Sequence, residues 1–123
     1  MFKSVLSILL GAALLGSCGG SLAPTQRLAD AQSAERSARE LGANDNPQAQ
    51  LSLKLAQQQI SQAQSAIEGG DNDRANSLLI RAKADAELSV AQAREQNAKQ
   101  GRQEAIADSA AQEKANAGQG AVK

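Results

Sequence analysis

The sequence predicts an all-α protein in which a short first helix precedes a long antiparallel pair of helices, either a three-helix or a coiled-coil-like arrangement. Its 123 residues are 41% hydrophobic but include a single aromatic side chain, and alanine dominates the rest. Alanine has the highest helix propensity and lets helices approach closely. Apolar residues recur at three- and four-residue steps, which is the period of packed helices. Two breaks rich in glycine or asparagine separate three such segments.

The chain divides into four parts by composition. An apolar segment at the start is followed by a glycine-rich stretch, a periodic helical region and a low-complexity end. We predict a lipoprotein signal peptide that includes a signal helix (1–17), a lipidated tether (18–23), a helical domain (24–96), and an extended helix or disordered tail (97–123).

The first part has the layout of a cleaved export signal. Lys3 supplies a positive charge, and an apolar run follows from Val5 to Leu15. This run is too short to span a membrane, and small residues close it, as in secretory signals. Leu15, Gly16 and Ser17 precede the chain's one cysteine, Cys18.

The segment resembles the lipobox of bacterial lipoproteins, which places a lipid-modified cysteine directly after the cut. The resemblance implies a diacylglycerol and an N-acyl chain on Cys18, and several acyl chains hold a small protein firmly on a membrane. Gly19 stands where inner-membrane lipoproteins of enterobacteria often carry Asp. By that sorting rule we expect the periplasmic side of the outer membrane, if the source is Gram-negative. The alternative for Cys18 is a buried small hydrophobe or a free thiol.

The first helix is predicted from Pro24 to about Leu41. Proline suits the first helical position because its missing N–H would be unpaired there anyway. Gly42 is a plausible stop. The expected apolar side consists of Pro24, Ala31, Ala34, Ala38 and Leu41, and the expected ion pairs on the solvent side are Glu35–Arg39 and Arg36–Glu40.

The second and third helices carry the clearest pattern. Asn46 and Pro47 predict the start of the second helix, which runs to about Glu68, and Gly69-Gly70-Asp71 predicts a glycine C-cap followed by an N-cap. A connection this short requires an antiparallel hairpin. The predicted seam consists of Leu53, Ala56, Ile60, Ala63 and Ile67 on the second helix, and Ala75, Leu79, Ala82, Ala86, Ser89 and Ala93 on the third.

A second, weaker apolar stripe lies roughly opposite this seam on both helices. Scattered surface leucines are normal, so the stripe can be incidental. Alternatively, the first helix covers one half of it and a partner or second copy covers the other. The large residues of this candidate partner stripe are Leu51, Leu55, Ile80 and Leu88.

The last part loses the apolar pattern. Gly101 and the later glycines weaken a helix there, and an isolated helix is marginal without packing. We expect a frayed or disordered tail, although the propensities allow the third helix to continue to about Ala115.

The residue inventory argues against several functions. The chain has no histidine, and Cys18 is assigned to the anchor, so histidine- or cysteine-based nucleophilic catalysis is excluded. Asp71-Asn72-Asp73 begins like a calcium loop but lacks its glycine and glutamate, so an N-cap is the better interpretation. With 13 basic and 13 acidic residues interspersed, no stripe follows nucleic acid. We predict no enzyme activity, catalytic residue, metal or cofactor.

Pro24, the alanine-spaced first helix, the Gly70-Asp71 break and the Ala84-Asp85-Ala86-Glu87 run together resemble a family of unknown function. The family occurs in envelope lipoproteins of proteobacteria, and larger members can carry an OmpA-like peptidoglycan-binding domain. The resemblance covers about Pro24 to Gln96 and implies a helical fold and an envelope location. It assigns no activity.

Three functions remain as hypotheses. The first is a non-enzymatic, lipid-anchored envelope protein whose hairpin is an interaction or assembly module, with a homo-oligomer or an envelope protein as partner. The second is a tether from membrane to peptidoglycan through Lys123, because murein lipoprotein similarly combines a lipidated cysteine, a heptad body and a C-terminal lysine. The third is a periplasmic chaperone or an accessory subunit.

Overall fold

The computed structural model describes residues 23–120. Three helices and one 3₁₀ turn make up this part of the chain: α1 (Pro24–Glu40), η1 (Ala43–Asp45), α2 (Pro47–Glu68) and α3 (Asn72–Gly120). The described residues are therefore all-α, as the sequence predicts. Both ends of α1, both ends of α2 and the start of α3 lie within one residue of their predicted positions. None of these helices combines the length and the apolar character of a membrane span.

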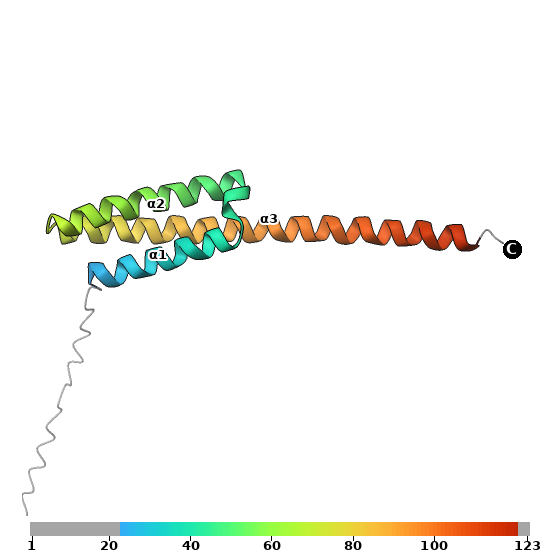
Figure 1. The fold of residues 1–123 in the computed structure, drawn as a ribbon, viewed down its shortest axis with the longest axis horizontal. Helices are drawn as coiled ribbons and strands as arrows, with labels where there is room; N and C mark the ends of the chain where they lie inside the picture. The colour runs from blue at the N-terminus through green and yellow to red at the C-terminus, as the bar shows by residue number, and fades with distance from the viewer. Residues whose placement is uncertain (1–22, 121–123) are drawn as a thin grey trace, which may run out of the picture.

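The helices form a bundle with a long projection (Figure 1). α2 runs antiparallel to α3, and α1 packs against both of them along the first half of α3. α3 has 49 residues, and its second half continues beyond the other two helices. We call the packed part, residues 24–97, the bundle, and residues 98–120 the arm.

Local capping explains where α1 ends and α2 begins. Gly42 has a φ of 81°, a left-handed conformation that suits glycine, and its N–H donates to the Arg39 carbonyl. The Asn46 side chain then accepts hydrogen bonds from the backbone N–H groups of Gln48 and Ala49. Pro47 occupies the first turn, where no N–H is needed.

The turn between α2 and α3 closes in the same way. Gly70 has a φ of 77°, and its N–H donates to the Ile67 carbonyl. The N–H of Asp71 donates to the Ala66 carbonyl, which completes a Schellman motif. The Asp71 side chain accepts from the N–H of Arg74, so this residue is the predicted N-cap of α3.

The core consists mostly of alanine, because small side chains let the three helices approach one another. All predicted seam residues are buried except Ile67, which is partly buried. One cluster joins Ala31 of α1 to both hairpin helices, and a second cluster joins Ala38 and η1 to the start of α2 and the middle of α3. The first contains Ala31, Ile60, Ala63, Leu78, Leu79 and Ala82, and the second contains Ala38, Ala43, Ala49, Leu53 and Ala93.

Polar side chains add direct links between the helices. The fully buried Ser89 hydroxyl donates to the Ala49 carbonyl at 2.7 Å. The Ser52 hydroxyl donates to Gln92 at 3.0 Å, and the Gln59 amide donates to Asp85 at 2.6 Å. These bonds fix the register of α2 on α3, which a seam of nearly identical alanines specifies only weakly.

The arm differs from the expected frayed tail. α3 remains helical to Gly120, which is the alternative that the propensities allow. Residues 98–118 are all exposed, so burial against another helix does not explain this part of α3. Alanine, glutamine, glutamate and lysine dominate the arm and favour helix without packing. Residues 121–123 lie outside the described part.

Candidate interaction surfaces

The side chains of the bundle offer little chemistry. The chain has no histidine, and residues 23–120 contain no group of three or more ligand side chains that could hold a metal ion. Two hollows between the helices are open, and most of the residues that line them have amide, hydroxyl or charged side chains.

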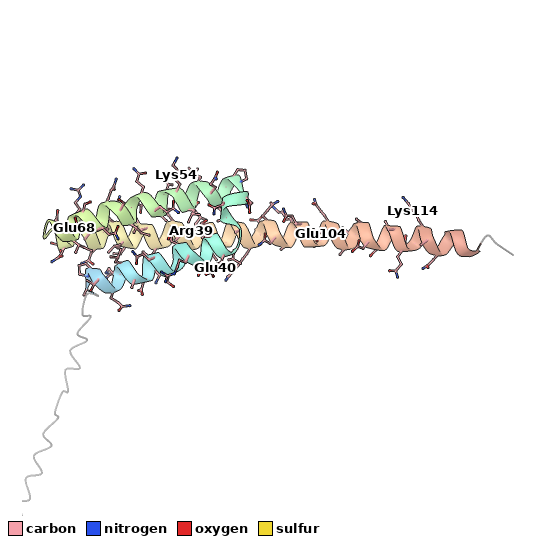
Figure 2. The ribbon with its side chains drawn as sticks, in the orientation of Figure 1. Arg39, Glu40, Lys54, Glu68, Glu104 and Lys114 are labelled. Atoms are coloured by element: carbon pink, nitrogen blue, oxygen red, sulfur yellow. The ribbon has the colours of Figure 1, made fainter. Side chains whose placement is uncertain are left out.

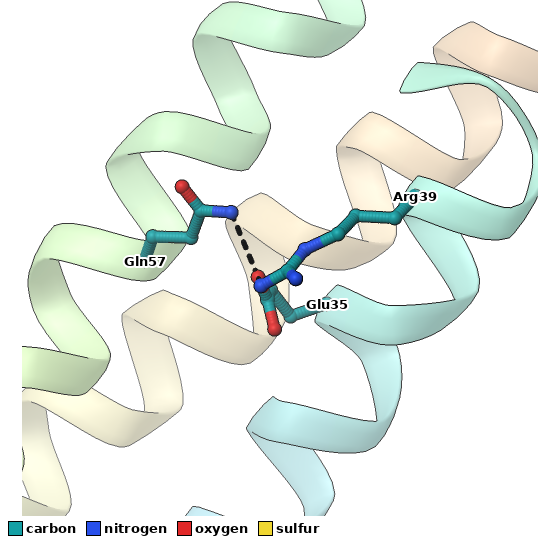
Figure 3. Close-up of polar contacts among 3 residues, drawn as sticks. All are labelled: Glu35, Arg39 and Gln57. Carbon is teal, nitrogen blue, oxygen red and sulfur yellow. Dashed lines mark hydrogen bonds and ion pairs between the residues drawn. The ribbon is translucent and has the colours of Figure 1, made fainter. Parts of the chain in front are cut away.

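The most buried charge is Glu35, in the middle of α1. Glu35 was expected on the solvent side, and this was wrong: Glu35 is 7% exposed and contacts Gln57 of α2. Its Oε1 accepts from the Gln57 amide at 2.8 Å and also from the Arg39 guanidinium, as Figure 3 shows. The predicted Glu35–Arg39 pair therefore forms, but at the contact between α1 and α2. The other predicted pair, Arg36–Glu40, does not form an ion pair in the described structure.

A groove of about 520 Å³ lies over this cluster. Because the same Glu35 oxygen serves both Arg39 and Gln57, the cluster links helices rather than holding a carboxylate ready for acid–base work. The groove itself is a polar surface between α1 and α2. Its lining residues are Gln32, Glu35, Arg39, Asn44, Gln57, Ile60, Ser61 and Gln64.

The four residues of the candidate partner stripe are exposed, but they do not form one continuous strip. Leu51 and Leu55 lie one turn apart on α2, with exposed fractions of 63% and 41%. Leu88 lies level with Leu55, because the Ser52–Gln92 and Gln59–Asp85 bonds bracket both residues. Ile80 lies about two turns from Leu88 and borders Arg27 of α1.

The expectation that the first helix covers half of this stripe was wrong. Ala31 of α1 instead packs over the seam, against Ile60, Ala63, Leu79 and Ala82. The small alanine side chains at this position let α1 approach both hairpin helices closely. The outer faces of α2 and α3 consequently stay open.

The arm is the largest exposed element. Figure 2 shows Glu104 and Lys114 on the arm, well beyond the ends of α1 and α2. Ile106 is 70% exposed. Near the start of the arm, Lys99 forms an ion pair with Glu95 at 2.6 Å. Lys99 lowers the pKa of the Glu95 carboxyl through its hydrogen bond and its charge. The charge of Arg102 makes a smaller contribution in the same direction.

The predicted anchor and tether residues lie outside the described residues. Leu15, Gly16, Ser17 and Cys18 precede the described part, and Lys123 follows it. Their roles stay predictions.

Two of the contacts between helices were not predicted from the sequence. Glu35 lies four residues after Ala31 and three before Ala38, so the helical period alone could have placed it on the buried side. Asn97 donates from its side-chain amide to the Leu41 carbonyl at 3.1 Å, which links the end of the bundle to the end of α1. No local pattern marks Asn97, because its partner is distant in sequence.

Comparison with known proteins gives one match. The profile of a family described as "Domain of unknown function (DUF4398)" matches residues 26–105, which include most of the bundle and the start of the arm. Neither a curated protein nor a solved structure matches the chain.

Proposed function

This chain belongs to the DUF4398 family, and on that premise we propose that it is a non-enzymatic, lipid-anchored protein of the cell envelope. In this proposal its helices serve as an interaction or assembly module. The export-signal pattern that ends at Cys18 supports the anchor. Two features support a binding role over catalysis: Oε1 of Glu35 already bonds both Arg39 and Gln57, and the hollows are open and lined mostly by polar residues.

The observation that carries the proposal is the position of the two ends of the described chain. α1 begins at the end of the bundle that holds the turn between α2 and α3, and the arm leaves from the other end (Figure 1). At about 1.5 Å per residue, α3 is roughly 70 Å long, and the arm makes up about half of it. An anchor at Cys18 would hold the bundle near the membrane and direct the arm away from it.

Metabolic labelling with a palmitate analogue tests the anchor. The full chain should take up the label and fractionate with the outer membrane, and Cys18→Ser should abolish both. The matched control is Cys18→Ser combined with Ser21→Cys, which moves the thiol by three residues and away from Leu15-Gly16-Ser17. The lipid-anchor proposal would be overturned if this control took up as much label as the parent chain. It would also be overturned if the parent chain fractionated with the membrane without taking up label.

The direction of the arm favours a second candidate, a tether to peptidoglycan, because Lys123 follows the arm. Muramidase digestion of cell walls should then release chains whose Lys123 carries muropeptide mass. Recovery of unmodified Lys123 alone would contradict the tether. A partner search by cross-linking in the envelope distinguishes this candidate from a pure interaction module.

A further inference from the structure

We propose that two copies of this chain pair antiparallel along the outward face of α3, with the two-fold axis level with Asn97. This inference names a partner for the interaction module of the proposed function. It does not depend on the lipid anchor, so each can fail separately. The outward face includes Arg81, Ala84, Leu88, Glu95, Lys99, Ile106, Ala110 and Glu113, all of which are exposed.

These residues share one side of α3. At about 100° per residue they fall within roughly 80° of arc, and Leu88 and Ile106 are five full turns apart. The neighbouring sides of α3 are occupied within the bundle. Asp85 and, at the edge of the arc, Gln92 bond to α2, and Val90 and Arg94 line a hollow shared with α1. The outward face therefore points away from both helices and continues unchanged from the bundle into the arm.

The order of residues on this face is self-complementary about Asn97. An antiparallel copy places each residue opposite the one equally far on the other side of Asn97. The aliphatic residues Leu88 and Ile106 then meet each other, alanine meets alanine, and the four charges named above meet opposite charges. Arg102, which lies in the same arc, meets the neutral amide of Gln92. The four resulting pairs are Leu88 with Ile106, Ala84 with Ala110, Arg81 with Glu113, and Glu95 with Lys99, and each occurs twice in the pair of copies.

The length of α3 agrees with antiparallel pairing about Asn97. α3 extends from Asn72 to Gly120, so Asn97 is close to its midpoint. Pairing about that level lays the arm of each copy along the bundle half of its partner's α3. The arm would then gain the packing that it lacks alone, and Leu88 and Ile106, which are 49% and 70% exposed, would be covered.

Charge reversal tests the register. Arg81→Glu places two acidic residues at both Arg81–Glu113 contacts of a pair, and Glu113→Arg places two basic residues there. Each variant alone should weaken dimerisation by about tenfold or more, since like charges replace opposite ones at two sites. A 1:1 mixture of the two variants should recover dimers, because opposite charges then meet again at both contacts. The chain carrying both substitutions should also dimerise.

The measurement is sedimentation equilibrium of the full chain in a density-matched detergent, with circular dichroism to show that each variant keeps its helix content. Glu104→Arg is the matched control, because Glu104 is an exposed acidic residue on the opposite side of the arm. It should leave dimerisation unchanged. A parent chain that stays monomeric at about 100 µM would overturn the proposal. So would single variants that dimerise like the parent, or a mixture that stays monomeric.

Discussion

The bundle and the arm belong to one continuous helix, yet different physics holds each of them. In the bundle half, α3 buries Leu79 and a row of alanines against two other helices. In the arm, residues 98–118 are all exposed, and the helix depends on backbone hydrogen bonds and intrinsic propensity. The same residue type should therefore have very different effects on stability in the two halves. Matched substitutions can test this.

The largest difference is expected for aliphatic side chains. Leu79 is 1% exposed, and Leu79→Ala should lower the free energy of unfolding by about 2–5 kcal/mol through lost burial and a cavity. Ile106→Ala in the arm should change it by no more than about 0.5 kcal/mol. Urea unfolding of both variants, at concentrations where the chain is monomeric, provides the measurement. Equal effects would mean that the arm is packed against something in solution.

Two glycines should respond with opposite signs. An added Cβ meets nothing within 4 Å at either Gly70 or Gly101, so space does not distinguish them. Gly70 has a φ of 77°, and Gly70→Ala should destabilise the protein by about 1–2 kcal/mol because alanine disfavours this conformation. Gly101 lies inside the helix, and Gly101→Ala should stabilise the arm by about 0.5–1 kcal/mol.

Thermal unfolding followed by circular dichroism measures the Gly70 effect, and amide hydrogen exchange around residue 101 measures the Gly101 effect. A loss of protection in Gly101→Ala would show that the arm bends at this residue in solution.

Two serines provide a smaller contrast. Ser89 donates to the Ala49 carbonyl of another helix, whereas Ser109 donates to the Ala105 carbonyl of its own helix. Ser89→Ala should cost about 0.5–1.5 kcal/mol, because a buried interhelical bond is lost. Ser109→Ala should be neutral or slightly stabilising, since alanine has the higher helix propensity. Chemical denaturation of the two variants separates these outcomes, and an unchanged midpoint for Ser89→Ala would contradict the register argument.

The smallest expected effect is a pH dependence at the junction of the two regions. Because Lys99 lowers the pKa of Glu95 in the folded chain, their interaction stabilises the helix above the ordinary glutamate pKa. That stabilisation is lost as the pH falls through the lowered pKa. NMR titration of the Glu95 carboxyl should show the lowered midpoint, and Lys99→Gln should raise it toward the ordinary value. A normal midpoint in the parent would contradict the ion pair.

Much of the fold was predictable because its signals are local. Pro24, Gly42, Asn46 and Gly70 act on their own turns, so they predict helix ends without any knowledge of the partner helices. The spacing of Leu53 to Ile67 predicts a buried seam, since period and burial are linked in a helix. Candidate sites were harder to predict. The exposure of Leu51, Leu55, Ile80 and Leu88 could be anticipated, whereas their separation around the bundle could not.

The sequence by itself determined that this chain is helical, where its helices begin and end, and which residues face the core of the hairpin. Only the tertiary structure decided that α1 lies over the seam, that Glu35 is buried against Gln57, and that half of α3 stands alone. The physical reason is that capping and periodicity act within one helix. The position of a third helix depends on which grooves its alanines can enter, and that is a property of all three helices together.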